Sequence, residues 1–204
     1  MEEKETIQTL LNIGAGKIYP LFLSRLHLYF LVNLDIMYEE SRTNEILEIE
    51  KRQKEWELFP NKNIEIFSNK KWEEFFPLYR LQFDKVVIYR FLEHIRMTKV
   101  LFFIYLLSTV VKVGGSVDII VPNYNKLAEL ILAEDPSERN FEANNILITT
   151  ELLNEPEDPH ASIWTPKRAK YFFELEGRFN IENITETFKF DGRDIYMQFN
   201  VRRV

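Results

Sequence analysis

Short apolar runs alternate with amphipathic stretches along most of the chain, which is typical of an α/β protein. Five of these runs are predicted strands, at residues 9–13, 27–35, 63–67, 83–89 and 116–121. A helix is predicted over 41–58, where Glu48/Arg52 and Glu50/Lys54 stand at i,i+4 spacing and indicate a solvated outer face. Asp84, at the start of the fourth strand, is interpreted as a structural carboxylate that caps nearby amides, with direct catalysis as the alternative.

The middle of the chain holds a strongly apolar stretch followed by an irregular one. Residues 98–113 are apolar nearly all round and predict a buried helix, with Gly114-Gly115 as its C-cap. Regularity is lost over 134–160, where prolines punctuate a polar stretch that holds one short predicted helix near 141–153. We expect this stretch to be an insertion or lid over the acceptor side of a binding cleft.

The C-terminal part predicts a helix and a hairpin. Thr165 is a good N-cap, Pro166 a good first helical residue and Gly177 a natural end of that helix. Strands predicted over 179–187 and 194–202 have no helix between them, so they should pair antiparallel. The whole pattern predicts one domain over 1–204, a Rossmann-like α/β sandwich. Its seven-stranded sheet is mostly parallel, its last strand is antiparallel, and helices lie on both faces.

Composition narrows the function classes. With 46 % hydrophobic and 14 % aromatic residues, the 204-residue chain should form a packed globule. A net charge of −6 argues against generic nucleic-acid binding, which needs a dominant basic surface. The absence of cysteine excludes disulfides, thiolate metal sites and cysteine nucleophiles, and we expect no metal.

The chain shows no predicted membrane span and no targeting segment. The apolar run at 100–111 is shorter than the roughly twenty residues that cross a bilayer. The acidic start, Met1 to Glu5, lacks the pattern of a signal peptide, so we expect a cytoplasmic protein. Its many Lys, Asn, Ile and Phe residues fit an AT-rich genome such as that of a phage, for which the compartment would be the host cytoplasm.

The first strand runs directly into a Gly-x-Gly turn. Gly14 and Gly16 lack a Cβ, so the backbone can turn sharply and a nucleotide-like ligand can lie on it. Asp35, at the end of the second strand, stands where such folds bind ribose hydroxyls. The plainer interpretations are a simple turn for the glycines and a solvated strand-end acid for Asp35.

Five segments in order resemble the motifs of small class I methyltransferases that use S-adenosylmethionine. They are LNIGAG (11–16), NLD (33–35), FDKVV (83–87) with LEHI (92–95), VKVGG (111–115) with VPN (121–123), and HASIWTP (160–166). The resemblance covers nearly the whole chain and implies S-adenosylmethionine as cofactor. The chain departs from the pattern in its third motif glycine, in the adenine-contacting aspartate, and in Arg90, a large cation near the cofactor.

The resemblance assigns roles to individual positions. The implied cofactor contacts are Asn12, Gly14, Ala15, Gly16, Asp35, Ile36, Ser68, Asn69 and Tyr89. The implied acceptor-side candidates are Glu93, His94 and His160, with His94 as a base or an orienting group. The alternative for Glu93-His94 is that the pair simply begins a helix and packs there. Trp164, Tyr124 and Tyr89 line the acceptor pocket in one interpretation and belong to the core in the other.

Chemistry limits the acceptor. Methyl transfer needs mainly alignment and desolvation, so the lack of an obvious acid–base dyad does not argue against it. Ring-carbon pyrimidine methylation needs a cysteine, and the Asn/Asp-Pro-Pro-aromatic loop of amino-methylating DNA enzymes is replaced by Tyr89-Arg90-Phe91-Leu92. We therefore expect methyl transfer to an oxygen or nitrogen of a small-molecule or glycan-type acceptor.

Two other function classes stay open. The departures fit a catalytically degenerate methyltransferase-like subunit that binds a protein partner. In that case Arg90 or Tyr19 should fill the cofactor cleft. A nicotinamide-dependent oxidoreductase fits the glycine turn and Asp35 but not the terminal hairpin.

Overall fold

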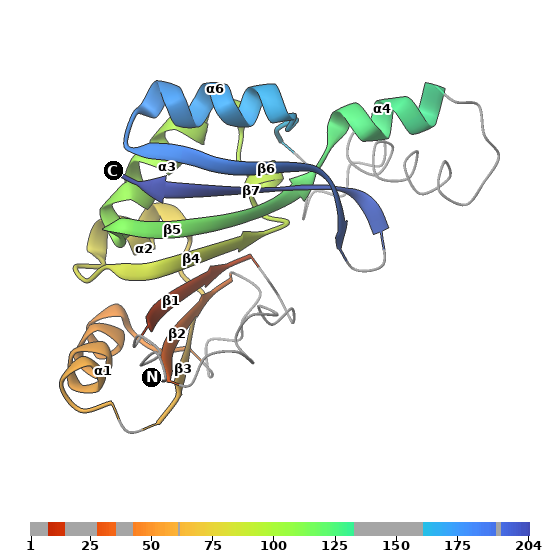
Figure 1. Ribbon diagram of the computed structural model, residues 1–204. Helices are drawn as coiled ribbons and strands as arrows, with labels where there is room; N and C mark the ends of the chain where they lie inside the picture. The colour runs from red at the N-terminus through yellow and green to blue at the C-terminus, as the bar shows by residue number, and fades with distance from the viewer. Residues whose placement is uncertain (1–7, 15–27, 36–42, 61, 133–160, 191–192) are drawn as a thin grey trace, which may run out of the picture.

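The computed structural model describes residues 8–14, 28–35, 43–60, 62–132, 161–190 and 193–204 (Figure 1). The strands in this part of the chain are β1 (Gln8–Ile13), β2 (Tyr29–Leu34), β3 (Ile64–Ser68), β4 (Phe83–Tyr89), β5 (Val111–Pro122), β6 (Phe179–Phe190) and β7 (Arg193–Arg203). The α-helices are α1 (Ile46–Leu58), α2 (Trp72–Leu78), α3 (Val100–Val110), α4 (Tyr124–Leu132) and α6 (Pro166–Glu176).

The seven strands form one sheet in the order β3-β2-β1-β4-β5-β7-β6. The pairs among β1 to β5 are parallel, whereas β7 runs antiparallel to both β5 and β6. In Figure 1 the sheet extends from β3 at one end to β6 at the other, and α6 lies along the β6 end. The predicted sheet and hairpin are confirmed. Strand order reverses between β1 and β4, which is where open α/β sheets bind ligands.

The main core is rich in aromatic side chains. One continuous hydrophobic cluster joins one face of the sheet to side chains of α1, α2, α3 and α6. Within it the rings of Phe75, Tyr79 and Phe83 form a stack with centroid separations of 4.9 and 5.0 Å. A smaller cluster on the other side includes Tyr89, Tyr124 and Tyr196. Tyr89 and Tyr124 are therefore core residues.

The boundary between α3 and β5 differs from the prediction. The helix ends at Val110 and β5 begins at Val111, so Gly114 and Gly115 lie inside the strand and do not cap the helix. Branched Val111 and Val113 favour the extended backbone. The glycines accommodate a register irregularity against β4, because Gly114 has φ +79° and a Cβ on Gly115 would lie 2.9 Å from the carbonyl oxygen of Asp84.

Helix α3 is also less buried than its composition predicts. Leu101, Phe102 and Tyr105 are 38–50 % exposed, so only one side of the helix faces the core. The ring of Tyr105 lies under the guanidinium of Arg178, 4.7 Å from its centroid.

Other element boundaries agree more closely with the sequence. Helix α1 begins at Ile46, later than expected. Helix α6 begins after Thr165, whose side chain accepts a hydrogen bond from the Arg168 amide, and it ends at Gly177 with φ +80°. Asp84 accepts from the amide and hydroxyl of Thr9 and pairs with Lys112 at 2.9 Å, which confirms its structural role. The predicted helix near 141–153 lies outside the described residues.

Candidate functional site

The C-terminal ends of β1, β2 and β4 meet at one edge of the sheet. Gly14 follows β1 with φ +70°, a conformation that favours glycine, and its amide donates to the Leu34 carbonyl at 3.1 Å. A Cβ on Gly14 would lie 2.5 Å from the Cβ of Phe91 and 2.7 Å from its ring. The turn therefore needs glycine for two reasons, its backbone angle and the close approach of Phe91.

Phe91 reaches Gly14 because of an unusual backbone angle in the preceding residue. Arg90 has φ +52°, a left-handed conformation that costs a non-glycine residue about 1–3 kcal/mol. Its amide donates to the Ile120 carbonyl at 2.9 Å, and its side chain is exposed. Arg90 thus does not fill the cleft, and the aromatic ring that packs on the glycine turn is that of Phe91. Tyr19 lies outside the described residues.

A pocket of about 200 Å³ opens beside this turn. Its walls come from the end of β2, the start of α2 and the segment after β4: Leu34, Asp35, Lys70, Lys71, Trp72, Glu73, Phe91, His94 and Ile95. Asp35 and His94, predicted from separate motifs, thus line one pocket. Trp72 and the two lysines were not predicted from the sequence, although they directly follow Ser68-Asn69 at a strand end.

The ends of β2 and β3 fix the backbone of Asp35. Its amide donates to the Ser68 carbonyl at 3.0 Å, so the strand pairing continues to the rim of the pocket. Ser68 is buried, and its hydroxyl accepts from the amide of Lys70 at 3.4 Å. Ser68 and Asn69 therefore shape the turn that leads to Lys70 and Trp72, and neither lines the pocket among the described residues.

Asn12 belongs to a polar ladder on the sheet face. Its side-chain amide donates to Asn33 at 2.9 Å, and Asn33 donates in turn to Glu65 at 2.8 Å. Both asparagines are at most 4 % exposed. The ladder links β1, β2 and β3 near the site, and a cofactor contact of Asn12 stays a prediction.

The turn Leu92–His94 is tied to residues that follow the predicted lid. The carbonyl of Glu93 accepts from the amides of Ala161 and Ser162 at 2.7 and 2.9 Å. The Ser162 hydroxyl and the Trp164 indole both donate to the Leu92 carbonyl, at 3.0 and 3.3 Å. The LEHI and ASIW motifs are thus one hydrogen-bonded unit.

Within that unit the side chains of Glu93 and His94 differ in environment. Glu93 is fully buried, whereas His94 is half-buried and lines the pocket. Trp164 is also fully buried and belongs to the core, so it does not line an acceptor pocket. Tyr89 is 7 % exposed, and burial, reinforced by the charge of Asp118, raises the pKa of its phenol.

Several predicted positions lie outside the described residues: Ala15, Gly16, Ile36, His160 and the stretch 134–160. In the described part of the chain, no cluster of three or more acidic or histidine side chains is arranged to hold a metal ion. No helix of that part is long and apolar enough to cross a membrane.

Comparisons with known proteins connect this geometry to one fold. No family model matches the chain, and no curated protein matches it in sequence. A solved S-adenosylmethionine-dependent methyltransferase from Methanosarcina mazei superposes with a TM-score of 0.58 and 19 % identity, over 97 % of this chain and 92 % of the other.

Two further solved structures resemble the chain to a similar degree. The N-methyltransferase NodS from Bradyrhizobium japonicum gives a TM-score of 0.53 at 14 % identity, over 96 % of this chain and 85 % of NodS. The Burkholderia thailandensis 1,6-didemethyltoxoflavin-N1-methyltransferase, with bound substrate and S-adenosylhomocysteine, gives 0.60 at 10 % identity, over 97 % and 71 % of the two chains. The chain thus has the class I methyltransferase fold that the motif order predicted.

Proposed function

We propose that the protein transfers a methyl group from S-adenosylmethionine to an oxygen or nitrogen of a small-molecule or glycan-type acceptor in the cytoplasm. The observation that supports this most is the pocket beside Asp35. It stands at the C-terminal edge of a methyltransferase-type sheet, next to a left-handed glycine turn. The structural neighbours, which include N-methyltransferases, support the same reaction class.

The pocket's residues suit the nucleoside end of the cofactor. The carboxylate of Asp35 would accept hydrogen bonds from the two ribose hydroxyls, and Trp72 with Leu34 and Ile95 would form an apolar wall for the adenine. At about 200 Å³ the pocket takes only part of such a ligand, so the amino-acid end would lie toward Gly14 and Phe91. Bound S-adenosylmethionine supplies a methyl group on a sulfonium, already activated for transfer.

The chain's own residues would handle the acceptor. His94 would hold the acceptor group in line and take the proton that its oxygen or nitrogen loses when the new bond forms. Glu93 is fully buried, so we assign it a role in positioning the turn that presents His94. His160 stays a candidate for contact with the acceptor.

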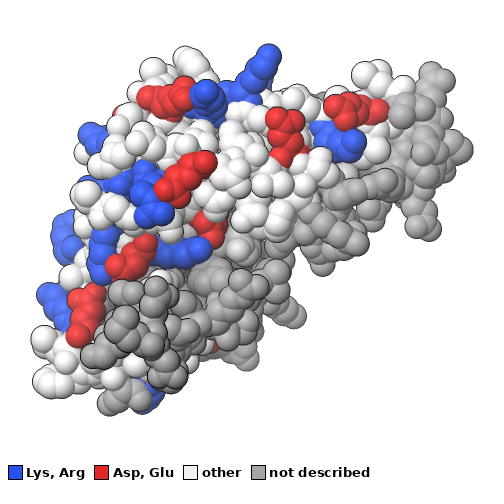
Figure 2. Space-filling model, in the orientation of Figure 1, with Lys and Arg blue, Asp and Glu red and all other residues white. Residues whose placement is uncertain are grey.

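Charge supports an acceptor other than nucleic acid. The net charge of −6 disfavours nucleic acid as substrate. On the face shown in Figure 2, the basic and acidic side chains of the described residues are interspersed, and these residues form no continuous basic surface. A small or glycan-type acceptor needs no such surface.

One observation favours the second candidate, a non-catalytic methyltransferase-like subunit. The contact between Phe91 and Gly14 places an aromatic ring on the turn where the cofactor's amino-acid end would lie. In this alternative Phe91 closes the site permanently and the fold serves protein binding.

Methyl transfer itself separates the two candidates. The purified protein is incubated with methyl-labelled S-adenosylmethionine and a panel of phenols, amines and oligosaccharides. Saturable label transfer to a panel member, lost in His94→Ala, supports the enzyme. Failure to bind S-adenosylmethionine at millimolar concentration, in a protein that unfolds cooperatively, excludes the enzyme and supports the subunit.

A further inference from the structure

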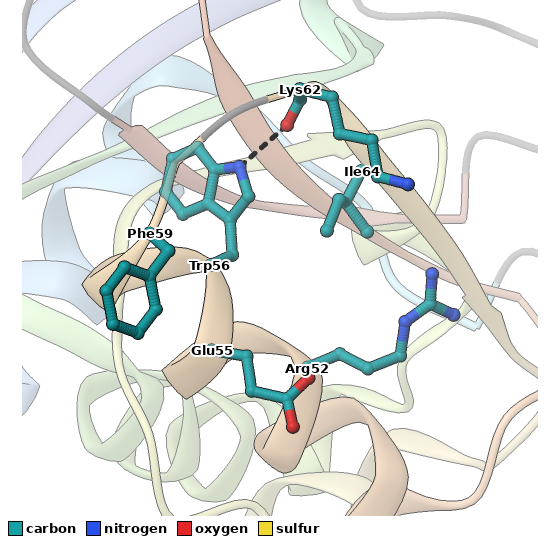
Figure 3. Close-up of a pocket in the computed structure, with 6 residues that line it drawn as sticks. All are labelled: Arg52, Glu55, Trp56, Phe59, Lys62 and Ile64. Atoms are coloured by element: carbon teal, nitrogen blue, oxygen red, sulfur yellow. Dashed lines mark hydrogen bonds between the residues drawn. The ribbon is translucent and has the colours of Figure 1, made fainter.

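A second pocket lies where α1 ends and β3 begins, with a volume of about 420 Å³ (Figure 3). It is lined by Arg52, Glu55, Trp56, Phe59, Lys62 and Ile64. Ile64 and Ser68 are the two ends of β3, about 13 Å apart at ~3.3 Å per residue. The second pocket is therefore at the opposite edge of the sheet from Asp35 and shares no lining residue with the site there.

One wall of this pocket is apolar and rigid. Trp56 is 2 % exposed, packs against Phe30 at a ring-centroid distance of 6.1 Å, and donates its indole N–H to the Lys62 carbonyl at 2.8 Å. That hydrogen bond fixes the turn from α1 into β3 and uses the only polar atom of the indole. Phe59 stands at the rim with 76 % of its surface exposed, so a bound apolar group would bury it favourably.

The rest of the lining carries two cations, Arg52 and Lys62, and one carboxylate, Glu55. Neither Arg52 nor Lys62 forms an ion pair or a side-chain hydrogen bond with another described residue. Glu55 also lines the pocket, and its carboxylate lies 4.0 Å from the amine of Lys51, one turn earlier in α1. In Figure 3 the guanidinium of Arg52 and the amine of Lys62 lie on the same side of the pocket, across from the ring of Phe59.

From this arrangement we propose that the pocket binds a small organic anion with an apolar body, such as an aryl carboxylate or an aryl phosphate. Its charged group is bound by Arg52 and Lys62, and its apolar body lies against Phe59, Ile64 and the edge of Trp56. Two cations that form no ion pair with any described acidic residue, in a chain of net charge −6, favour an anion at this point. The volume lies within the range of ordinary small-molecule sites.

Calorimetric titration of the whole protein tests both halves of the proposal. Phenylacetate and phenyl phosphate supply the two anionic groups on one ring, phenylacetamide removes the charge, and acetate removes the ring. We expect saturable binding of at least one aryl anion. The affinities of phenylacetate and phenyl phosphate then show which anionic group the pocket prefers. Both phenylacetamide and acetate should bind at least about 10-fold more weakly, the effect of losing a charge-assisted contact or the apolar contact.

Variants locate the binding. Arg52→Gln and Lys62→Gln should each lower the affinity for the aryl anion about 10-fold or more. Lys54→Gln, an exposed lysine on the same helix that does not line the pocket, should leave its affinity unchanged. The proposal is wrong if neither aryl anion saturates, if Lys54→Gln weakens binding as much as Lys62→Gln, or if S-adenosylhomocysteine displaces the anion. The last result would place the anion in the Asp35 pocket.

Discussion

Arg90 and Phe91 show how one backbone angle determines the environment of the site. The left-handed conformation of Arg90 brings Phe91 to within contact of Gly14, and Phe91 then forms a wall of the Asp35 pocket. The energetic cost of that angle is retained next to the proposed binding site, where strained residues are often found. Phe91 is thus the residue that separates the two candidate functions.

Gly14→Ala tests this contact, with Gly114→Ala as a matched control. Both glycines have positive φ, but a Cβ on Gly114 meets nothing within 4 Å. Gly114→Ala should lower the free energy of unfolding by about 1–2 kcal/mol through backbone strain alone. Gly14→Ala should cost about 1–3 kcal/mol more, because its Cβ overpacks against Phe91. Urea unfolding measures the difference, and equal losses would mean that the Phe91 contact is absent in solution.

Asp35→Ala tests the proposed ribose contact. The variant should weaken the binding of S-adenosylhomocysteine by about 1–3 kcal/mol while the protein stays folded, because the charged acceptor for the two ribose hydroxyls is lost. Glu73→Gln is the control, since Glu73 lines the same pocket but pairs with Lys99 at 3.1 Å. If both variants lose affinity equally, general charge and not a ribose contact accounts for binding.

At the scale of elements, one turn and one segment distant from it in sequence join the site to the rest of the fold. The segment Ala161–Trp164 holds the turn Leu92–His94 through backbone and side-chain hydrogen bonds. Because His94 lines the pocket, the position of this segment and the geometry of the pocket are linked.

Ser162→Ala should therefore change ligand binding as well as stability. Loss of a buried hydrogen bond to the Leu92 carbonyl should cost about 1–3 kcal/mol of stability. It should also weaken the binding of S-adenosylhomocysteine. Ser108→Ala removes an equally buried hydroxyl that donates to the Tyr105 carbonyl within α3, so it should leave binding unchanged. Calorimetry on both variants checks the link, which fails if Ser162→Ala binds like the wild type.

The contact between Tyr79, at the end of α2, and Gln53 of α1 predicts that stability depends on pH. Tyr79 donates its hydroxyl to Gln53, and burial, with the charges of Glu50 and Glu57, raises the pKa of Tyr79 above its ordinary value. Above about pH 10 the tyrosine ionises in the unfolded chain but stays protonated in the folded one, so the unfolded state binds fewer protons. Stability should fall as pH rises through this range.

Urea unfolding at about pH 8 and about pH 10.5 measures this effect. Tyr79→Phe should remove part of the loss, because that side chain no longer ionises in the unfolded state. Tyr171→Phe, at an exposed tyrosine, should not. An identical loss in all three proteins would show that the buried phenol of Tyr79 has no part in it.

The elements also show where sequence reasoning succeeds and where it fails. Strand cores such as Phe83–Tyr89 and the capped helix after Thr165 follow from local patterns, and they were predicted. The junction at Val110-Val111 was not predicted, because an apolar run does not distinguish helix from strand. Pairing with β4 determines where the strand begins. Helix α4 was also missed.

At the scale of the whole molecule, topology brings distant motifs together. Gly14, Asp35 and His94 belong to three separate motifs, and the sheet order brings the ends of their strands to one edge. The close contact of Phe91 with Gly14 depends on the backbone angle of Arg90, which no sequence pattern encodes. Likewise, the second pocket, beside Trp56, is formed by the end of α1 and the start of β3, and the sequence pattern there did not predict it.

A crystal structure of the protein grown with saturating S-adenosylhomocysteine would show whether the Asp35 pocket binds the cofactor. We expect the ribose hydroxyls within hydrogen-bonding distance of the Asp35 carboxylate. We also expect the adenine beside Trp72 and the amino-acid end toward Gly14, with Phe91 moved from its present contact. An empty pocket with Phe91 still packed on Gly14, or a nucleoside bound away from Asp35, would contradict the claim that this chain binds S-adenosylmethionine for methyl transfer.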